Sequence, residues 1–322
     1  MCPESLLPWY GRGLRPPALV LRGWLMLLAL YMPTPALSES VDVVIVVSSY
    51  SKIYVALASR VESGLPYSRK RYMRTIDVAA VDDLKLPDVI VAVGLKATQA
   101  VANRFDVPVI STLIPRSSFE EIARQRQGKN FRASFSAVYL DQPLGRQLDL
   151  IRLALPGRKR IGVVFGPQSR ALSEAIHSES RSRNLTLQTV MVNNEVGLRL
   201  ALEPLLLESD VLLSLPDPAV FNSSTISSVL FTSYRIGVPV VGFSPAYVRA
   251  GAMVAVHSSP EQFADQVLDM LSGFARESRA LPPPQYPNRF SVIVNPDVAR
   301  ALDLVLDATV LERRLSMMEN AP

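Results

Sequence analysis

Small polar and aromatic side chains stand at the ends of most strands that the sequence predicts. In the first half of the chain these residues are Ser48, Ser49, Tyr50, Gly94, Thr112 and Tyr139, and in the second half Gly166, Ser169, Asp217, Ser244, Tyr247 and His257. Ligands of open parallel sheets bind outside the carboxyl ends of the strands, where helix N-termini offer N–H donors. Hydroxyl groups and aromatic rings suit a small organic solute. The pattern therefore predicts a solute site, although each Ser or Thr can equally be a helix cap.

Asp217 is the most informative of these residues, because it lies between Pro216 and Pro218 directly after an apolar strand. Its carboxylate could bind the amino group of a ligand. It could equally cap the helix that begins near Asn222, or hold a tight turn between the two prolines. Nearby aromatic residues such as Tyr247 could stack on a ligand or pack the core. The sequence leaves these alternatives open.

Motifs for catalysis and for nucleotide binding are absent from the sequence. It contains no G-x-x-x-x-G-K-[ST], no G-x-G-x-x-G after a strand and no G-x-S-x-G elbow. The two histidines, His177 and His257, are far apart and lack metal-ligand spacing, so we expect no metal and no cofactor. An enzyme with this sequence would need a general base, for which only Asp217 and His257 are candidates near strand ends.

Two successive series of strands and helices position these residues. β-branched runs at 41–47 and 87–94 are typical of strands buried on both faces of a parallel sheet. The first series also has strands at 107–112 and 135–140, a weaker strand at 72–79, helices at 53–65 and 96–104, and a polar, less regular segment at 116–132. The second series has helices at 143–155, 168–183, 195–207 and 221–236, and strands at 160–166, 185–192, 210–215, 238–243 and 252–257. In the helix at 221–236, Ile226, Val229, Leu230 and Tyr234 fall on one face. The fold class is α/β, with two doubly wound, Rossmann-like lobes joined by a hinge.

The end of the chain does not fit a simple tandem pair. A helix at 260–276 precedes a proline-rich linker, which is followed by a strand at 290–294 and a helix at 297–306. This pair is too small to fold alone, so we expect it to return and complete the first lobe. The predicted domains are residues 39–140 with 258–322 for lobe I, and 141–257 for lobe II.

Residues 1–38 have the pattern of a signal peptide. Three arginines precede the apolar run 24–31, and the small-residue site Ala36-Leu37-Ser38 follows Pro33. The run is too short to span a bilayer. Cys2, the only cysteine, lies before the apolar run rather than after it, where a lipid-anchored cysteine would stand. We therefore predict an exported, periplasmic protein that is not a lipoprotein.

Composition excludes several classes of protein. The 322 residues are 48% hydrophobic and 20% charged, which excludes disorder, and the single cysteine excludes a disulfide scaffold. The net charge of +5 comes without basic blocks or interleaved aromatic residues, so we expect no nucleic-acid partner.

Two stretches of the second lobe resemble a known family. Residues 215–222 (LPDPAVFN) and 237–252 (GVPVVGFSPAYVRAGA) resemble the ABC transporter substrate-binding protein family, whose members have the type I periplasmic-binding-protein fold. Residues 155–163 and 290–302 are similar to that family's entry into the second lobe and to its closing element. Family members commonly carry a His-Pro pair after the first strand, whereas this chain has Ser48-Ser49-Tyr50-Ser51 there. The resemblance therefore carries the fold and leaves the ligand open.

The resemblance implies a solute-binding component of an ABC importer, which closes around a small solute and presents it to an ABC permease or another inner-membrane partner. The alternatives are an exported accessory or sensor subunit that docks on a membrane partner and, less favoured, a two-lobed periplasmic enzyme. For an amino-acid-like solute, Ser49, Thr112 and Ser169 would hold the carboxylate and Asp217 the ammonium group. Tyr50, Tyr139 or Tyr247 would cover the side chain.

Overall fold

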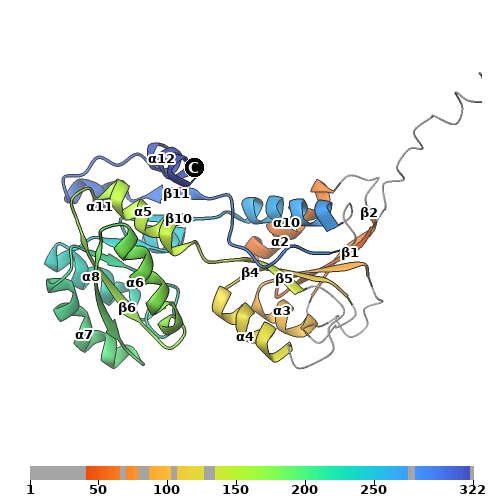
Figure 1. Ribbon diagram of the computed structural model, residues 1–322, viewed down its shortest axis with the longest axis horizontal. Coiled ribbons are helices and arrows are strands. Elements are labelled where there is room, and N and C mark those ends of the chain that lie inside the picture. Colours follow the sequence, from red (N-terminus) through yellow and green to blue (C-terminus); the bar gives the residue numbers. More distant parts are fainter. Residues whose placement is uncertain are drawn as a thin grey trace, which may run out of the picture. The chain divides into compact units, whose positions relative to one another are not determined.

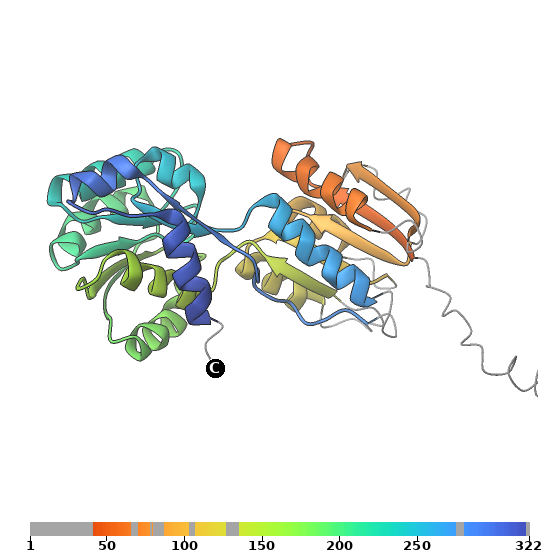
Figure 2. The ribbon, with the colours of Figure 1, turned by 90° about the horizontal axis from the view of Figure 1, so that it is seen from above.

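The computed structural model describes residues 41–65, 70–77, 79, 87–102, 107–126, 135–274 and 280–319. The predicted signal peptide and Cys2 lie outside these residues. The described residues form two α/β lobes, each built on its own sheet (Figures 1 and 2).

The first lobe contains a five-stranded, fully parallel sheet of order β2-β1-β3-β4-β5. Its strands are β1 (Val41–Val47), β2 (Lys70–Asp77), β3 (Val89–Val93), β4 (Val109–Ile114) and β5 (Phe135–Tyr139). Every residue of β3 and β4 is buried, as expected for β-branched runs covered on both faces.

Helices cover both faces of the first sheet. They are α2 (Lys52–Gly64), α3 (Leu95–Val101), α4 (Arg116–Arg126) and α10 (Pro260–Phe274). The helices α2 and α10 pack together on one face, where Leu57, Val61 and Phe263 share a core cluster with Ile45. Helix α4 occupies most of the segment predicted to be irregular, because Phe119 and Ile122 lie one turn apart and pack against the sheet.

The second lobe contains a six-stranded sheet of order β11-β10-β9-β8-β6-β7. Its strands are β6 (Arg160–Phe165), β7 (Thr186–Met191), β8 (Val211–Leu213), β9 (Val240–Gly242), β10 (Val254–His257) and β11 (Ser291–Val294). All pairs are parallel except β10 with β11. The α/β fold class with two mostly parallel sheets is confirmed.

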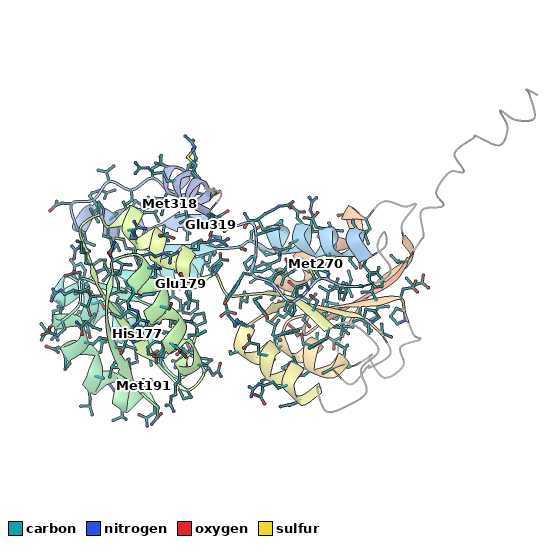
Figure 3. All side chains as sticks on the ribbon, viewed as in Figure 1. His177, Glu179, Met191, Met270, Met318 and Glu319 are labelled. Atoms are coloured by element: carbon teal, nitrogen blue, oxygen red, sulfur yellow. The ribbon has the colours of Figure 1, made fainter. Side chains whose placement is uncertain are left out.

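Two layers of helices cover the second sheet. The helices are α5 (Leu144–Ala154), α6 (Ser173–Ser182), α7 (Glu195–Leu207), α8 (Ile226–Ile236), α9 (Pro245–Ala250), α11 (Pro296–Ala301) and α12 (Ala308–Glu319), with a 3₁₀ turn at Arg170–Leu172. Figure 3 labels His177 on α6 and Glu319 at the end of α12. In α8, Val229 is buried, whereas Tyr234 at the other end of the predicted face is 73% exposed.

The predicted return of residues 290–306 to the first lobe is also wrong. Strand β11 pairs antiparallel with β10, and α12 packs on α5 and β11. Phe290, Val292, Leu311 and Leu315 are buried in the same core cluster as Leu148 of α5. Of the elements after residue 258, α10 packs in the first lobe, whereas β11, α11 and α12 belong to the second.

The chain therefore crosses between the lobes three times, near residues 140–143, 258–259 and 287–290. Before its crossing, the third segment runs beside β5, where Gln285 exchanges backbone hydrogen bonds with Ala137 and Tyr139. The crossings are joined by side chains: Gln142 Nε2 donates to Ser258 Oγ (2.9 Å), and Ser258 Oγ donates to the carbonyl of Arg289 (2.6 Å).

Candidate functional site

Ser48 and Gly94 lie together at the carboxyl edge of the first sheet. Ser48 Oγ donates to the carbonyl of Val93 (2.8 Å) and accepts from the amide of Ala97 (2.9 Å) in α3. Gly94 has φ +88°, and its amide donates to the carbonyl of Thr112 (2.8 Å). A Cβ at Gly94 would lie 2.7 Å from Ser48 Oγ, which explains the glycine. These two predicted residues hold the strand ends in place.

Ser49 and Tyr50 are exposed, with 67% of Tyr50 accessible. Neither side chain makes a hydrogen bond to another described residue, whereas the next residue, Ser51, caps α2 by accepting from the amide of Tyr54. The run after β1 thus divides into a capping residue and two residues that face solvent.

The end of β4 is locally strained. The hydroxyl groups of Ser111 and Thr112 are fully buried and have no hydrogen-bond partner. Leu113 follows with φ +53°, and the register of β4 against β5 shifts there. A buried, non-glycine residue with positive φ beside unpaired hydroxyls is typical of a binding-site edge.

Tyr139 ends β5 inside an aromatic group. Its ring lies edge-on to Phe119 (5.8 Å) and to Tyr286 (5.4 Å). Burial raises the pKa of Tyr139 to about 12. The hydroxyl of Tyr286 accepts from Arg116 Nη1 (2.7 Å). The sequence analysis missed Tyr286, which comes from the proline-rich segment rather than from a strand end.

In the second lobe, Gly166, Ser169 and Asp217 form one compact group. Asp217 is 2% exposed, and its Oδ2 accepts from the amides of Gln168 (2.9 Å) and Ser169 (2.8 Å) and from Ser169 Oγ (2.9 Å). Its Oδ1 accepts from the amide of Ala219 (3.0 Å). A Cβ at Gly166 would lie 2.5 Å from the carboxyl carbon. Asp217 thus joins the loop after β6 to the turn after β8.

Ser244, Tyr247 and His257 are spread along the same sheet. Ser244 caps α9, and Tyr247 packs against Phe243 and Phe221. Burial raises the pKa of Tyr247, whose hydroxyl has no partner. Burial lowers the pKa of His257, at the end of β10. The contacts of Tyr247 are those of a core residue.

A cavity of about 30 Å³ lies beside the first crossing. Its walls include Asp141, Gln142 and Gln147 from the first crossing and α5, and Ser169 from the predicted set. The other lining residues are Arg116, Ser117, Leu144, Gln168, Leu172, Leu215, Pro216 and Tyr286. Asp141 and Gln147 were not identified from the sequence. Asp141 follows the end of β5 more closely than Asp217 follows the end of β8, so the same criterion could have found it.

Asp141 is the charged acceptor in this cavity. Its Oδ2 accepts from the amide of Arg116 (2.6 Å). Burial raises the pKa of Asp141, although the amide of Arg116, the backbone amide of Asp141 itself and the charge of Arg116 act in the opposite direction. The carboxylate is therefore poorly compensated for the water it has lost.

The guanidinium of Arg146, in the same region, has several hydrogen-bond acceptors around it. Arg146 is 6% exposed, and its guanidinium donates to both carboxylate oxygens of Glu319 (2.5 and 2.8 Å), to Gln142 Oε1 (2.7 Å) and to the carbonyl of Pro287 (2.9 Å). It also lies 4.2 Å from the ring centroid of Phe290. Arg146 thus ties the first and third crossings to the C-terminal helix.

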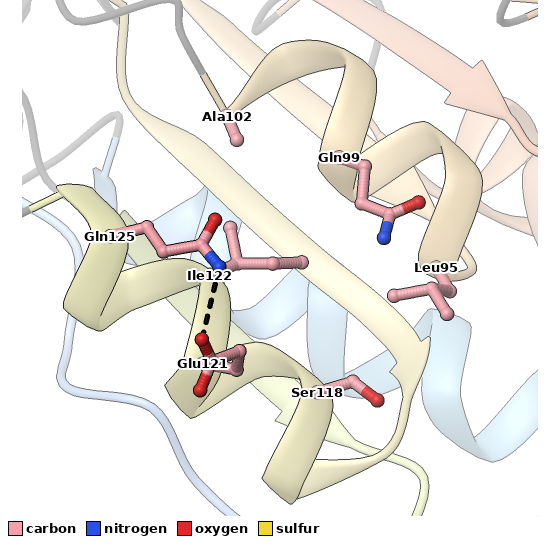
Figure 4. A pocket seen from close by; sticks show the side chains of 7 residues that line it. All are labelled: Leu95, Gln99, Ala102, Ser118, Glu121, Ile122 and Gln125. Atoms are coloured by element: carbon pink, nitrogen blue, oxygen red, sulfur yellow. Dashed lines mark hydrogen bonds between the residues drawn. The ribbon is translucent and has the colours of Figure 1, made fainter.

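A separate groove of about 280 Å³ lies between α3 and α4 (Figure 4). Gln99 and Leu95 contribute from α3, and Glu121 and Gln125 from α4, where Gln125 Nε2 donates to Glu121 Oε1 (3.0 Å). None of the predicted site residues lines it.

The described residues contain no group of three or more His, Cys, Asp or Glu side chains placed to hold a metal ion. None of their helices is both long and apolar enough to cross a bilayer.

Known structures with the same fold cover most of the chain. A conserved domain protein from Vibrio cholerae is 19% identical over 85% of this chain and 98% of its own, with a TM-score of 0.58. A substrate-binding protein with adhesive properties from Clostridium difficile, solved ligand-free and open, is 16% identical over 83% of this chain and 96% of its own (TM-score 0.63). An ABC domain from Streptococcus pneumoniae in complex with L-Trp is 16% identical over 84% of this chain and 98% of its own (TM-score 0.56). At these identities the likeness concerns the fold, which is that of type I periplasmic binding proteins.

No curated protein matches the sequence. A family model does: the ABC transporter substrate binding protein model matches residues 77–317, which include strands β3 to β5 of the first sheet, the whole second sheet, all three crossings and the Asp217 loop. The match spans most of the chain and agrees with the resemblance of residues 215–222 and 237–252. The chain belongs to the ABC transporter substrate binding protein family.

Proposed function

We propose that this protein is the solute-binding component of an ABC importer, exported to the periplasm, where it binds a small organic solute between its two lobes. The observation that carries the proposal is the family match over both lobes, together with three chain crossings of the kind a hinge requires. The partner in this proposal is a membrane permease.

Binding by hinge closure explains the distribution of polar groups. A solute that contacts both lobes stabilises the closed state by its greater affinity for that state, and no covalent step is needed. We therefore propose a binding protein rather than an enzyme. The hydroxyls of Ser111 and Thr112, buried and without a partner at the end of β4, support a polar site at this edge of the first lobe.

We propose an amino-acid-like solute. This class includes L-Trp, which is bound in the structure of the ABC domain from Streptococcus pneumoniae. Thr112 and Ser49 remain candidates for its carboxylate, and the exposed Tyr50 for its side chain. Asp217 we assign to the loop rather than to the ligand, because four protein donors already occupy its carboxylate.

The test is a thermal-shift screen of the purified protein against amino acids, sugars, organic acids and amines. A cognate solute at 100 times its Kd should stabilise the protein by about 2.7 kcal/mol. Small-angle scattering should show a smaller radius of gyration with that solute, and mass spectrometry should recover it unchanged. Chemical conversion of the solute would indicate an enzyme, and no hit in any class would favour a docking subunit. Neighbouring permease and ATPase genes would separate import from sensing.

A further inference from the structure

The cavity beside the first crossing contains an acceptor without a donor. Gln147 is 5% exposed and lines the cavity, and its Oε1 is buried with no hydrogen-bond partner. The amide orientation is fixed, because Gln147 Nε2 donates to the carbonyl of Gln142 (3.0 Å) and the opposite orientation would place two oxygens together. A buried acceptor of this kind requires a donor from outside the protein.

A carboxylate shares the cavity with this acceptor. Asp141 is half-buried, and its Oδ2 receives the amide of Arg116. The charged and titratable groups around it are Arg116, Glu120 and Tyr139. The guanidinium of Arg116 is engaged with Glu120 (2.6 Å) and Tyr286 (2.7 Å) rather than with Asp141. Among the described residues, no side-chain donor lies within hydrogen-bond distance of the Asp141 carboxylate.

We infer that Asp141 and Gln147 Oε1 form a subsite for the amino group of the solute. This inference rests on the proposed function and names the class of solute: one with an ammonium or other cationic N–H group. The cavity of about 30 Å³ has room for one or two water-sized groups, and an ammonium group is of that size. Its donors would satisfy the amide oxygen, and its charge would compensate the carboxylate.

The assignment differs from the one that the sequence suggested. Asp217 is the more deeply buried carboxylate, but the protein itself supplies four donors to it. The Asp141 cavity offers a charged acceptor and a neutral acceptor, of which the second has no partner. Recognition of a cationic group therefore belongs at the first crossing and not at the loop after β8.

The experiment compares the wild type with Asp141→Asn and Gln147→Met by calorimetry. The probes are the L-amino acids, each paired with its N-acetyl derivative, and a matched set of sugars and organic acids without an amino group. Losing one charge-assisted hydrogen bond should weaken binding of the free amino acid by about 10- to 100-fold. The N-acetyl partner should bind weakly to the wild type and be nearly insensitive to Asp141→Asn. The control is Asp303→Asn, which changes an exposed carboxylate.

Four results would overturn the inference. If Asp141→Asn binds the amino acid as tightly as the wild type, or if the N-acetyl partner binds equally well, the subsite is elsewhere. If the wild type binds only solutes without an amino group, the subsite fails and the proposed function stands. If no probe of any class binds, the proposed function fails as well.

A measurement on the wild type covers the case in which a variant does not fold. The carboxyl carbon of Asp141 is titrated by NMR with and without the bound amino acid. Ligand should lower the pKa of Asp141, because the ammonium group favours the charged carboxylate. An unchanged titration would contradict the subsite.

Discussion

The loop around Asp217 and the cavity around Asp141 differ in how many hydrogen-bond donors the protein supplies to a buried carboxylate. Asp217 is surrounded by three backbone amides and one hydroxyl, so its lost hydration is replaced by the protein. Asp141 receives the amide of Arg116, and burial raises its pKa. Both residues directly follow a parallel strand or its short extension, so position in the sheet does not distinguish them.

The comparison teaches that the number of donors, rather than burial, separates a structural carboxylate from one that can receive a ligand. A fully satisfied group stabilises the fold and has little left to offer a solute. A buried carboxylate with too few donors lowers the free energy of unfolding. A ligand that supplies the missing donors raises it again when it binds. Four predictions test this contrast.

The largest effect is expected at the Asp217 loop. Asp217→Asn places an amide group where backbone donors converge, so we expect a loss of about 3 kcal/mol in the free energy of unfolding. Urea unfolding measures it, with Asp303→Asn as the exposed control. Solute affinity, corrected for the folded fraction, should not change. A stable Asp217→Asn protein with weakened binding would reverse the assignment of the two carboxylates.

Arg146→Met tests whether a cation with all its acceptors in place near the crossings stabilises the fold, as we expect of Asp217. Arg146→Met removes the partner of Glu319, Gln142 and Pro287 while keeping an apolar chain over Phe290, so we expect a loss of about 2 kcal/mol. Arg60→Met is the matched control, because Arg60 pairs with Asp265 at the surface and should cost less than about 1 kcal/mol. Equal losses in the two variants would contradict a structural role for the Arg146 contacts.

Gly166 tests how rigidly Asp217 is held. A Cβ in Gly166→Ala would meet the Asp217 carboxyl group at 2.5 Å, and the four hydrogen bonds prevent that group from turning away. We expect a loss of about 1–2 kcal/mol in thermal or urea unfolding. Gly273→Ala is the control: nothing lies within 4 Å of its Cβ, and within α10 it should stabilise slightly. An unchanged Gly166→Ala stability would mean that the loop yields easily.

Much of the fold follows from local pattern. The β-branched runs of β1 and β3 and the alternation of strands and helices predict two α/β lobes, which the structure has. The position of β11 could not be predicted, because four residues contain no information about which free sheet edge they will join. Helix α12 was missed because only Leu311 and Leu315 mark its buried face.

The candidate site could be predicted only where a strand end marks it. That criterion selected Gly166, Ser169 and Asp217, which contact one another in the structure. It could not reveal that Asp217 is saturated, since its donors are backbone amides, which every residue carries. Gln147 lies within a helix, so its unpaired oxygen depends on tertiary packing alone.

The smallest effect, and the one with the opposite sign, is expected for Asp141. Below the ordinary pKa of 3.8 the carboxyl group is protonated in both the folded and the unfolded state and contributes nothing to pH dependence. As the pH rises, the unfolded chain releases its proton first, because burial raises the pKa of the folded state, so the wild type loses stability over that window. Asp141→Asn removes this cost, and its stability relative to the wild type should therefore increase from pH 3.5 to pH 7 in urea unfolding without solute. A relative stability that instead falls with rising pH would mean that the protein stabilises the Asp141 carboxylate as it does that of Asp217, and the contrast between the two regions would be lost.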